Sequence, residues 1–201
     1  MRWTRAAIFA IAPLLLAACA NTQIVSSWRD PTVSEVQFHR VLAVAMTIRP
    51  SRRRAVEDRM VVAIERSGAR AVPSYSLIPA ADTRNVEAVR SAVLAGGFDG
   101  AVTWSTTSVR DETTFVPGPS AGFYSYYDAG WASAYDPGYL RTDRIVRITT
   151  KVYQVTRGSD RLIWRGNSRT VDPDSIDDLV DGVADATAAS MRSHGMLAAR
   201  P

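Results

Sequence analysis

The stretch RIVRITTKVYQVTRGSDRLIWRGNSRTV, residues 144–171, decides which fold this sequence can adopt. Side chains alternate here with a period of two, as in a strand that buries one face. One face would hold Val146, Ile148, Thr150 and Val152, and the other Arg147, Thr149, Lys151 and Tyr153. The residues Arg-Gly-Ser-Asp then interrupt the pattern before a second apolar run. We therefore predict an antiparallel hairpin.

Outward from this hairpin, apolar patterning predicts three helices and three more strands. In chain order they are expected at about 41–46 (strand), 51–67 (helix), 69–79 (strand), 85–95 (helix), 98–115 (strand) and 175–194 (helix). Pro73 indicates that the strand at 69–79 lies at a sheet edge, and Ser51 is the expected N-cap of the first helix. The order predicts an α/β (α+β) fold, a mixed sheet of about five strands with helices packed on it.

The N-terminus has the pattern of a secretory signal. Arg2 and Arg5 precede the apolar run 6–18, which is shorter than the roughly 20 residues that a spanning helix needs. The ending Leu-Ala-Ala-Cys, residues 16–19, is similar to the bacterial lipobox. That similarity implies cleavage between Ala18 and Cys19, and a covalent diacylglycerol and acyl chain on Cys19 in place of any other cofactor. With Ala20 next, it also implies the periplasmic face of the outer membrane.

Three regions follow from this assignment. Residues 1–18 are the expected signal peptide, residues 19–38 the lipid anchor and tether, and residues 39–197 a single α/β domain. Removal of 18 of the 201 residues leaves 183, which is enough to bury a sizeable core. Cys19 is the only cysteine, so this core must be stable without an internal disulfide.

Charge gives no support to a nucleic-acid partner. The signal removes two of the 24 basic residues, so 22 remain against 20 acidic ones and the net charge falls to +2. The basic cluster 52–54 is followed by Glu57 and Asp58. We interpret it as a solvated helix face, with a lipid-headgroup patch as the alternative.

The connection 117–140, between the third and fourth expected strands, is longer than most ordered loops and rich in glycine and proline. It contains the aromatic residues Phe123, Tyr124, Tyr126, Tyr127, Trp131, Tyr135 and Tyr139. They are candidate contacts for an envelope protein or polymer, since Tyr and Trp give contact area at low entropic cost. A weakly ordered hairpin tip and insertion into the membrane interface remain alternatives.

Catalytic and metal motifs are weak. The segment Gly-Pro-Ser-Ala-Gly, residues 118–122, matches a nucleophile-elbow pattern around Ser120, but no helix is expected after it. His39 and His194 have no companion at metal-ligand spacing. The acidic residues from Asp172 to Asp185 lack the order of a calcium loop and are better assigned to capping the last helix, by Asp174 or Ser175. We predict no catalytic residue and no metal site.

Four segments carry a family resemblance: SSWRDP, VLAVAM, RRAVEDRMVVAIERSGARAVPSYSLIP and GFDGAVTWS. Together they resemble bacterial envelope lipoproteins of the domain of unknown function 4136 type, over most of the mature chain. The resemblance implies the lipid anchor and an envelope location, and it implies no activity. The order of elements is also similar to small α/β domains of envelope assembly proteins such as the curli secretion lipoprotein, as an analogy of fold only.

The sequence therefore predicts a lipid-anchored periplasmic lipoprotein that is not an enzyme. Its expected role is a non-catalytic binding or assembly component of the cell envelope, held to the membrane by its anchor. Two alternatives remain, an envelope hydrolase that uses Ser120 and an oligomeric assembly or secretion subunit.

Overall fold

The computed structural model describes residues 21–116, 127, 139–156 and 159–196. Within them, six strands, three α-helices and two short 3-10 helices follow one another along the chain. In chain order these elements are β1 (Thr22–Arg29), β2 (Arg40–Ala45), α1 (Pro50–Glu65), β3 (Arg70–Pro73), η1 (Ser74–Ser76), η2 (Ala80–Asp82), α2 (Val86–Gly96), β4 (Gly100–Val116), β5 (Tyr139–Thr156), β6 (Ser159–Val171) and α4 (Ile176–Ser193).

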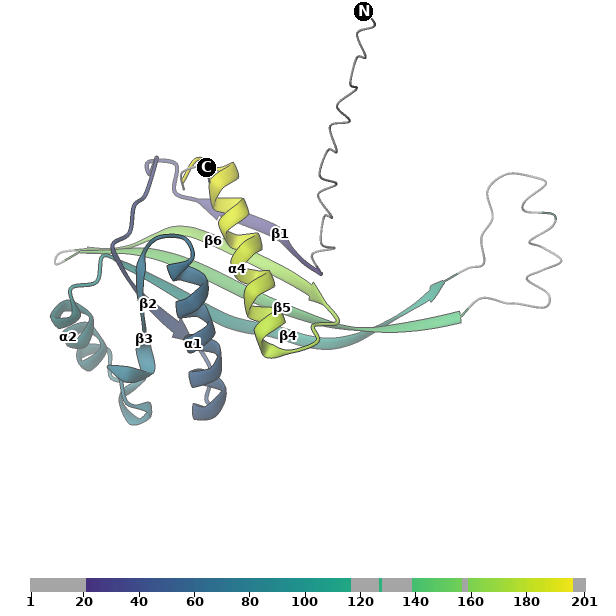
Figure 1. Ribbon diagram of the computed structural model, residues 1–201, viewed down its shortest axis with the longest axis horizontal. Coiled ribbons are helices and arrows are strands. Elements are labelled where there is room, and N and C mark those ends of the chain that lie inside the picture. Colours follow the sequence, from purple (N-terminus) through teal and green to yellow (C-terminus); the bar gives the residue numbers. More distant parts are fainter. Residues whose placement is uncertain (1–20, 117–126, 128–138, 157–158, 197–201) are drawn as a thin grey trace, which may run out of the picture.

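The six strands form one mixed sheet in the order β1-β6-β5-β4-β2-β3. Strand β2 runs parallel to β3 and β4, and the other neighbours are antiparallel. Helices α1 and α4 lie side by side on one face of the sheet (Figure 1). Helix α2 packs on the other face, because Leu42 contacts α2 while its neighbour Ala43 contacts α1. The α+β class with a mixed sheet and packed helices is thus confirmed.

The predicted hairpin, β5 and β6, lies inside the sheet, between β1 and β4. Strands β5 and β6 pair antiparallel along nearly their whole length, as expected. Val146, Ile148, Thr150 and Val152 are all buried on the face beneath the helices. Thr149, expected on the opposite face, is buried as well, and its hydroxyl donates to Asn167. The strand that ends at Pro73 lies at the sheet edge, which is also as predicted.

The expected tether was wrong over most of its length. Residues 22–29 form β1, a sixth strand that pairs with β6. The side chain of Thr22 is buried and bonds that of Thr170 at 2.8 Å. Val36 is also buried, and its N–H donates to the carbonyl of Met196. The folded body therefore begins at Thr22 and not at residue 39, because these residues have partners in the sheet and in the C-terminal segment.

Two of the expected helix features need correction. Ser51 is not the N-cap of α1, because the helix begins at Pro50, which takes the first helical position, after Arg49. The helical spacing over 85–95 also predicts that Val86 and Leu94 face inward, but both are exposed on α2. The cap of α4 is as predicted, since the Ser175 hydroxyl accepts from the N–H of Asp178 at 3.0 Å.

The basic cluster 52–54 is not a uniformly solvated face. Arg53 is only 6% exposed and Glu57 is fully buried. The guanidinium of Arg53 donates to Glu57 Oε1 at 3.0 Å, to the Ser74 hydroxyl and to the carbonyl of Ile78. Glu57 in turn accepts from the N–H groups of Ala45 and Tyr75 and from the Ser74 hydroxyl. This network fastens α1 to β2 and to the turn after β3, since every member has a partner.

Candidate functional site

The most unusual surface of the molecule is a two-stranded ribbon. Strand β2 pairs with β4 only as far as Trp104, and β6 pairs with β5 only from Ile145 onward. Beyond them, residues 111–116 of β4 pair with residues 139–144 of β5 and with no third strand among the described residues. We call this segment the ribbon. At about 3.4 Å per residue it extends roughly 20 Å from the sheet, and it projects clear of the body in Figure 1.

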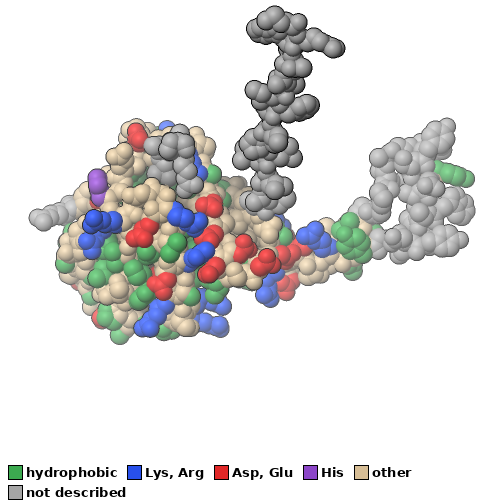
Figure 2. Space-filling model, in the orientation of Figure 1, with side chains coloured by type: hydrophobic (Ala, Val, Ile, Leu, Met, Phe, Trp, Pro, Cys, Tyr) green, Lys and Arg blue, Asp and Glu red, His purple; other side chains and the backbone are tan. Residues whose placement is uncertain are grey.

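The base of the ribbon is held by charges. Glu112 accepts from Arg147 at 3.1 Å and from Arg169 at 3.5 Å, which joins three strands. Arg144 lies 3.6 Å from Asp111, its cross-strand partner. Figure 2 shows these alternating blue and red side chains along the first part of the ribbon. A charged, solvated base suits a ribbon that has water on both faces.

The far end of the ribbon is apolar. Phe115 and Leu140 are directly opposite each other, and their side chains are 55% and 71% exposed. The next pair, Val116 and Tyr139, lies on the other face, with Tyr139 63% exposed. Figure 2 shows the resulting hydrophobic patch at the end of the ribbon. We call these four residues the ribbon tip. A two-stranded ribbon on its own buries little apolar surface and gains little stability from it. Large apolar side chains exposed at its tip are therefore unexpected unless another surface covers them.

The ribbon tip carries part of the predicted contact surface. Tyr139 belongs to β5 and not to the connecting loop, and Tyr127 is 61% exposed. The other candidate contacts, Phe123, Tyr124, Tyr126, Trp131 and Tyr135, lie outside the described residues, as do Ala18, Cys19 and Ser120. The sequence analysis missed Phe115 and Leu140 as contact residues. Their position at the two borders of the aromatic loop was the available signal.

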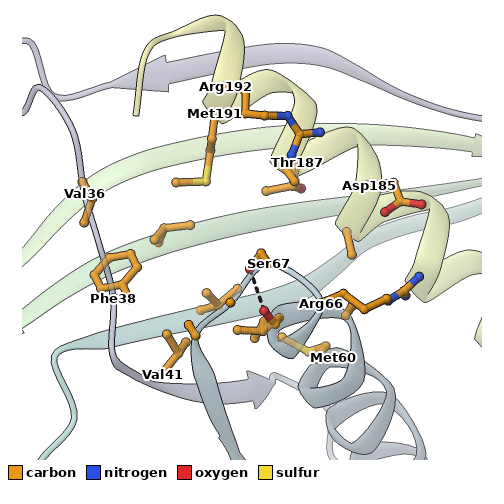
Figure 3. A pocket seen from close by; sticks show the side chains of 18 of the residues that line it. Val36, Phe38, Val41, Met60, Arg66, Ser67, Asp185, Thr187, Met191 and Arg192 are labelled. Atoms are coloured by element: carbon orange, nitrogen blue, oxygen red, sulfur yellow. Dashed lines mark hydrogen bonds between the residues drawn. The ribbon is translucent and has the colours of Figure 1, made fainter. Parts of the chain in front are cut away.

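A second feature is a cavity of about 610 Å³ between α1, α4 and the sheet. Figure 3 shows Thr187 and Met191 on α4 and Met60 on α1 pointing into it, with Val36 and Phe38 across from them. Small residues occupy the facing helix positions, namely Ala63 on α1 and Ala184 and Ala188 on α4. Because these side chains are short, the two helices leave space between them above Trp104, Val102 and Val152.

Charges at the mouth of the cavity are mostly paired. Asp181 accepts from both Arg59 and Arg66, which links α4 to α1. Burial alone would raise the pKa of Asp181, but the hydrogen bonds from Arg59 and Arg66 outweigh it, so that pKa lies below its usual value. His39 at the same mouth bonds Asp99 at 3.0 Å. Arg192, in contrast, has no side-chain hydrogen bond or ion pair among the residues described.

Neither a metal-ligand cluster nor a membrane-spanning helix is found in the described part of the chain. His39 bonds Asp99, but no group of three His, Cys, Asp or Glu side chains that could hold a metal ion is found among the described residues. Over the same residues, none of the helices combines the length and apolar character needed to cross a bilayer.

Comparisons with known proteins give only distant likeness. No protein-family model matches the chain, and no curated protein matches it. Solved structures do match, among them two described as PelC dodecamers from Paraburkholderia phytofirmans, the second a variant with a single substitution. The first has 9% identity and a TM-score of 0.44, covering 88% of this chain and 99% of that one. The second has 10% identity and the same TM-score, covering 81% and 95%. Likeness at this level assigns neither family nor function to this chain.

Proposed function

We propose that this protein is a lipid-anchored component of the bacterial cell envelope, held through acylated Cys19 at the periplasmic face of the outer membrane. It binds another envelope protein or polymer through the ribbon tip and the aromatic segment 117–140. Its role is binding or assembly, without catalysis. The observation that carries the proposal is the exposed apolar pair Phe115 and Leu140 at the end of a projecting ribbon.

Three physical features support a contact surface at this place. The tip stands away from the body, so a partner can reach both of its faces. Its large apolar side chains are exposed in the isolated chain and would gain from burial, at about 25 cal/mol per Å². Tyr139 of the tip, together with the Tyr residues of the aromatic segment, would add rigid contact area of the kind that binding loops use.

The test is site-specific photo-crosslinking in living cells. A photoreactive residue at Leu140 should capture a specific partner, and the same residue at Ala189, which is exposed on α4, should not. The double variant Phe115→Ser, Leu140→Ser should lower capture from position 127 by about tenfold or more, the loss expected for truncating central contact residues. Equal capture from Leu140 and Ala189 would contradict the proposal.

The same experiment separates the alternatives. Crosslinks that join copies of this chain in high yield would favour the oligomeric assembly subunit. Ser120→Ala, in the segment outside the described residues, tests the envelope hydrolase: loss of function with unchanged folding and membrane location would overturn the non-catalytic role.

A further inference from the structure

We propose that the cavity between α1 and α4 binds a single-chain amphiphile with an anionic head group, such as a long-chain fatty acid. The proposal is independent of the ribbon, so its failure would leave the proposed function untouched. It stands on the walls of the cavity and on one cation, Arg192, that is unpaired among the described residues.

The walls favour an aliphatic chain. They come from five parts of the chain: residues 36–41, α1, the turn 66–69 after it, α4 and the central strands. Val41, Met60 and Val152 are each 1% exposed, and Met191 is 5% exposed. A volume of about 610 Å³ lies within the roughly 300–1,000 Å³ range of small-molecule sites. The apolar part of these walls offers water few hydrogen-bond partners. An alkyl chain would instead make van der Waals contacts in the space that the small side chains of α1 and α4 leave empty.

Two buried polar atoms on the lining residues lack partners. The indole Nε1 of Trp104 and the hydroxyl of Thr187 have no hydrogen bond in the described structure, although Trp104 is 6% and Thr187 8% exposed. A buried donor without a partner costs about 1–3 kcal/mol. Both residues line the cavity, but the two atoms themselves are covered by neighbouring side chains, so a ligand oxygen would reach them only after those side chains shift.

The mouth favours a negative head group. Four of its residues carry or can carry charge: Arg66, Arg192, His39 and Asp185. Arg66 is already bound by Asp181 and His39 by Asp99. Asp185 is exposed to water, whereas Arg192 is half-buried and unpaired within the described structure. In Figure 3 Arg192 lies next to Thr187 at the α4 side of the opening. A carboxylate there would pair with the guanidinium while its chain entered the cavity.

The test uses the full chain in its own membrane, so that no detergent competes for the cavity. Membranes are treated with photoreactive, alkyne-tagged hexadecanoate, and labelled peptides are identified by mass spectrometry. We expect labels on the cavity residues Met60, Ile64 and Met191, and we expect excess untagged hexadecanoate to remove them. Labelling confined to exposed surfaces would overturn the proposal.

Variants test the cavity and the head group separately. Ala184→Leu with Ala188→Leu should fill the cavity and cut labelling by at least tenfold, while Ala189→Leu, on the exposed side of the same helix, should not change it. Arg192→Gln should weaken labelling by the acid about tenfold but leave labelling by photoreactive hexadecanol unchanged. Arg52→Gln, an exposed arginine on α1, is its control.

Two further outcomes would also decide against the proposal. Equal labelling of the filled and unfilled variants would mean that the probe does not enter the cavity. Equal or stronger labelling by a photoreactive zwitterionic lysophospholipid, insensitive to Arg192→Gln, would mean that the site takes phospholipid chains and does not select an anionic head. If the cavity-filling pair fails to fold, Ala188→Leu alone replaces it and should also lower labelling.

Discussion

Arg53 shows how a single residue departs from its neighbours. Arg52 and Arg54 are exposed, as a basic cluster suggests, but Arg53 is buried against Glu57. Helical spacing alone places residues 53 and 57 on the same face as Met60, since positions three and four apart share a face. The interpretation of the cluster 52–54 as a solvated face was therefore wrong for Arg53, since the turn of the helix directs this residue toward the core. Charged side chains can occupy such a face because β2 and the turn after β3 supply their partners.

Arg53→Gln should destabilise the protein by about 3–5 kcal/mol, because it leaves the buried carboxylate of Glu57 without its cation. Arg52→Gln, one residue away on the exposed face, should change stability by less than about 0.5 kcal/mol. Urea unfolding followed by circular dichroism measures both. Equal midpoints for the two variants would mean that the buried network contributes nothing to stability.

Among the elements, α1 and α4 are joined by the pairing of Asp181 with Arg59 and Arg66. The pKa of Asp181 is lowered in the folded protein, because these hydrogen bonds outweigh the effect of burial. A carboxylate with a lowered pKa stabilises the fold at pH values above the ordinary pKa of about 3.9. That stabilisation is lost as the pH falls through the lower, folded-state pKa.

Asp181→Asn should therefore lower the urea midpoint between pH 5 and 7, and the difference from the wild type should shrink below about pH 4. The effect should be smaller than that of Arg53→Gln, because the paired groups are partly exposed. Asp185→Asn, one turn later on α4 and exposed, is the control. A difference that persists unchanged at low pH would show that the carboxylate charge is not responsible.

Strand β1 explains why part of the sheet escaped prediction. In the hairpin β5–β6, strand β5 alternates regularly from Val146 to Val152, ahead of a register shift between Val152 and Tyr153, and this regular stretch made the hairpin predictable. In β1 the pairing register shifts between Ile24 and Ser26, so the alternation breaks in the middle of the strand. A bulge of this kind removes the periodic signal on which the prediction depended. Strand β1 lies at the sheet edge and buries little, so its apolar residues Val25 and Trp28 are exposed. Their positions therefore give no pattern of buried and exposed residues from which a strand could be predicted.

At the scale of the whole molecule, the cavity could not be predicted either. Each of its lining residues has the pattern of ordinary core on its own element, and only the arrangement of two helices over the sheet leaves the space unfilled. The ribbon was more accessible to prediction, since a long aromatic connection between two strands indicated a projecting surface. Its apolar borders at Phe115 and Leu140 lie in strands, where apolar residues are expected.

The proposed membrane attachment concerns the whole chain and has a direct test. Cells fed with labelled palmitate should label the wild type, and Cys19→Ser should carry no label and leave the membrane fraction. Equal labelling of the two proteins would contradict an acylated Cys19. A full-length, unmodified chain in the cytosol would contradict the envelope location as well.

The register of the sheet has one more consequence. Thr22 pairs with Thr170, Thr170 with Val146, and Val146 with Val109, so β1 begins at the end of the sheet from which the ribbon leaves. Only Ala20 and Asn21 lie between Cys19 and Thr22, and the three Cα–Cα steps from Cys19 to Thr22 can span at most about 11 Å. If the acyl chains on Cys19 are embedded in a bilayer, the connection between the bilayer and the folded body is short. The base of the ribbon then stays close to the lipid headgroups. Any molecule held by Phe115 and Leu140 would then have to be met beside the membrane, within a few nanometres of its surface.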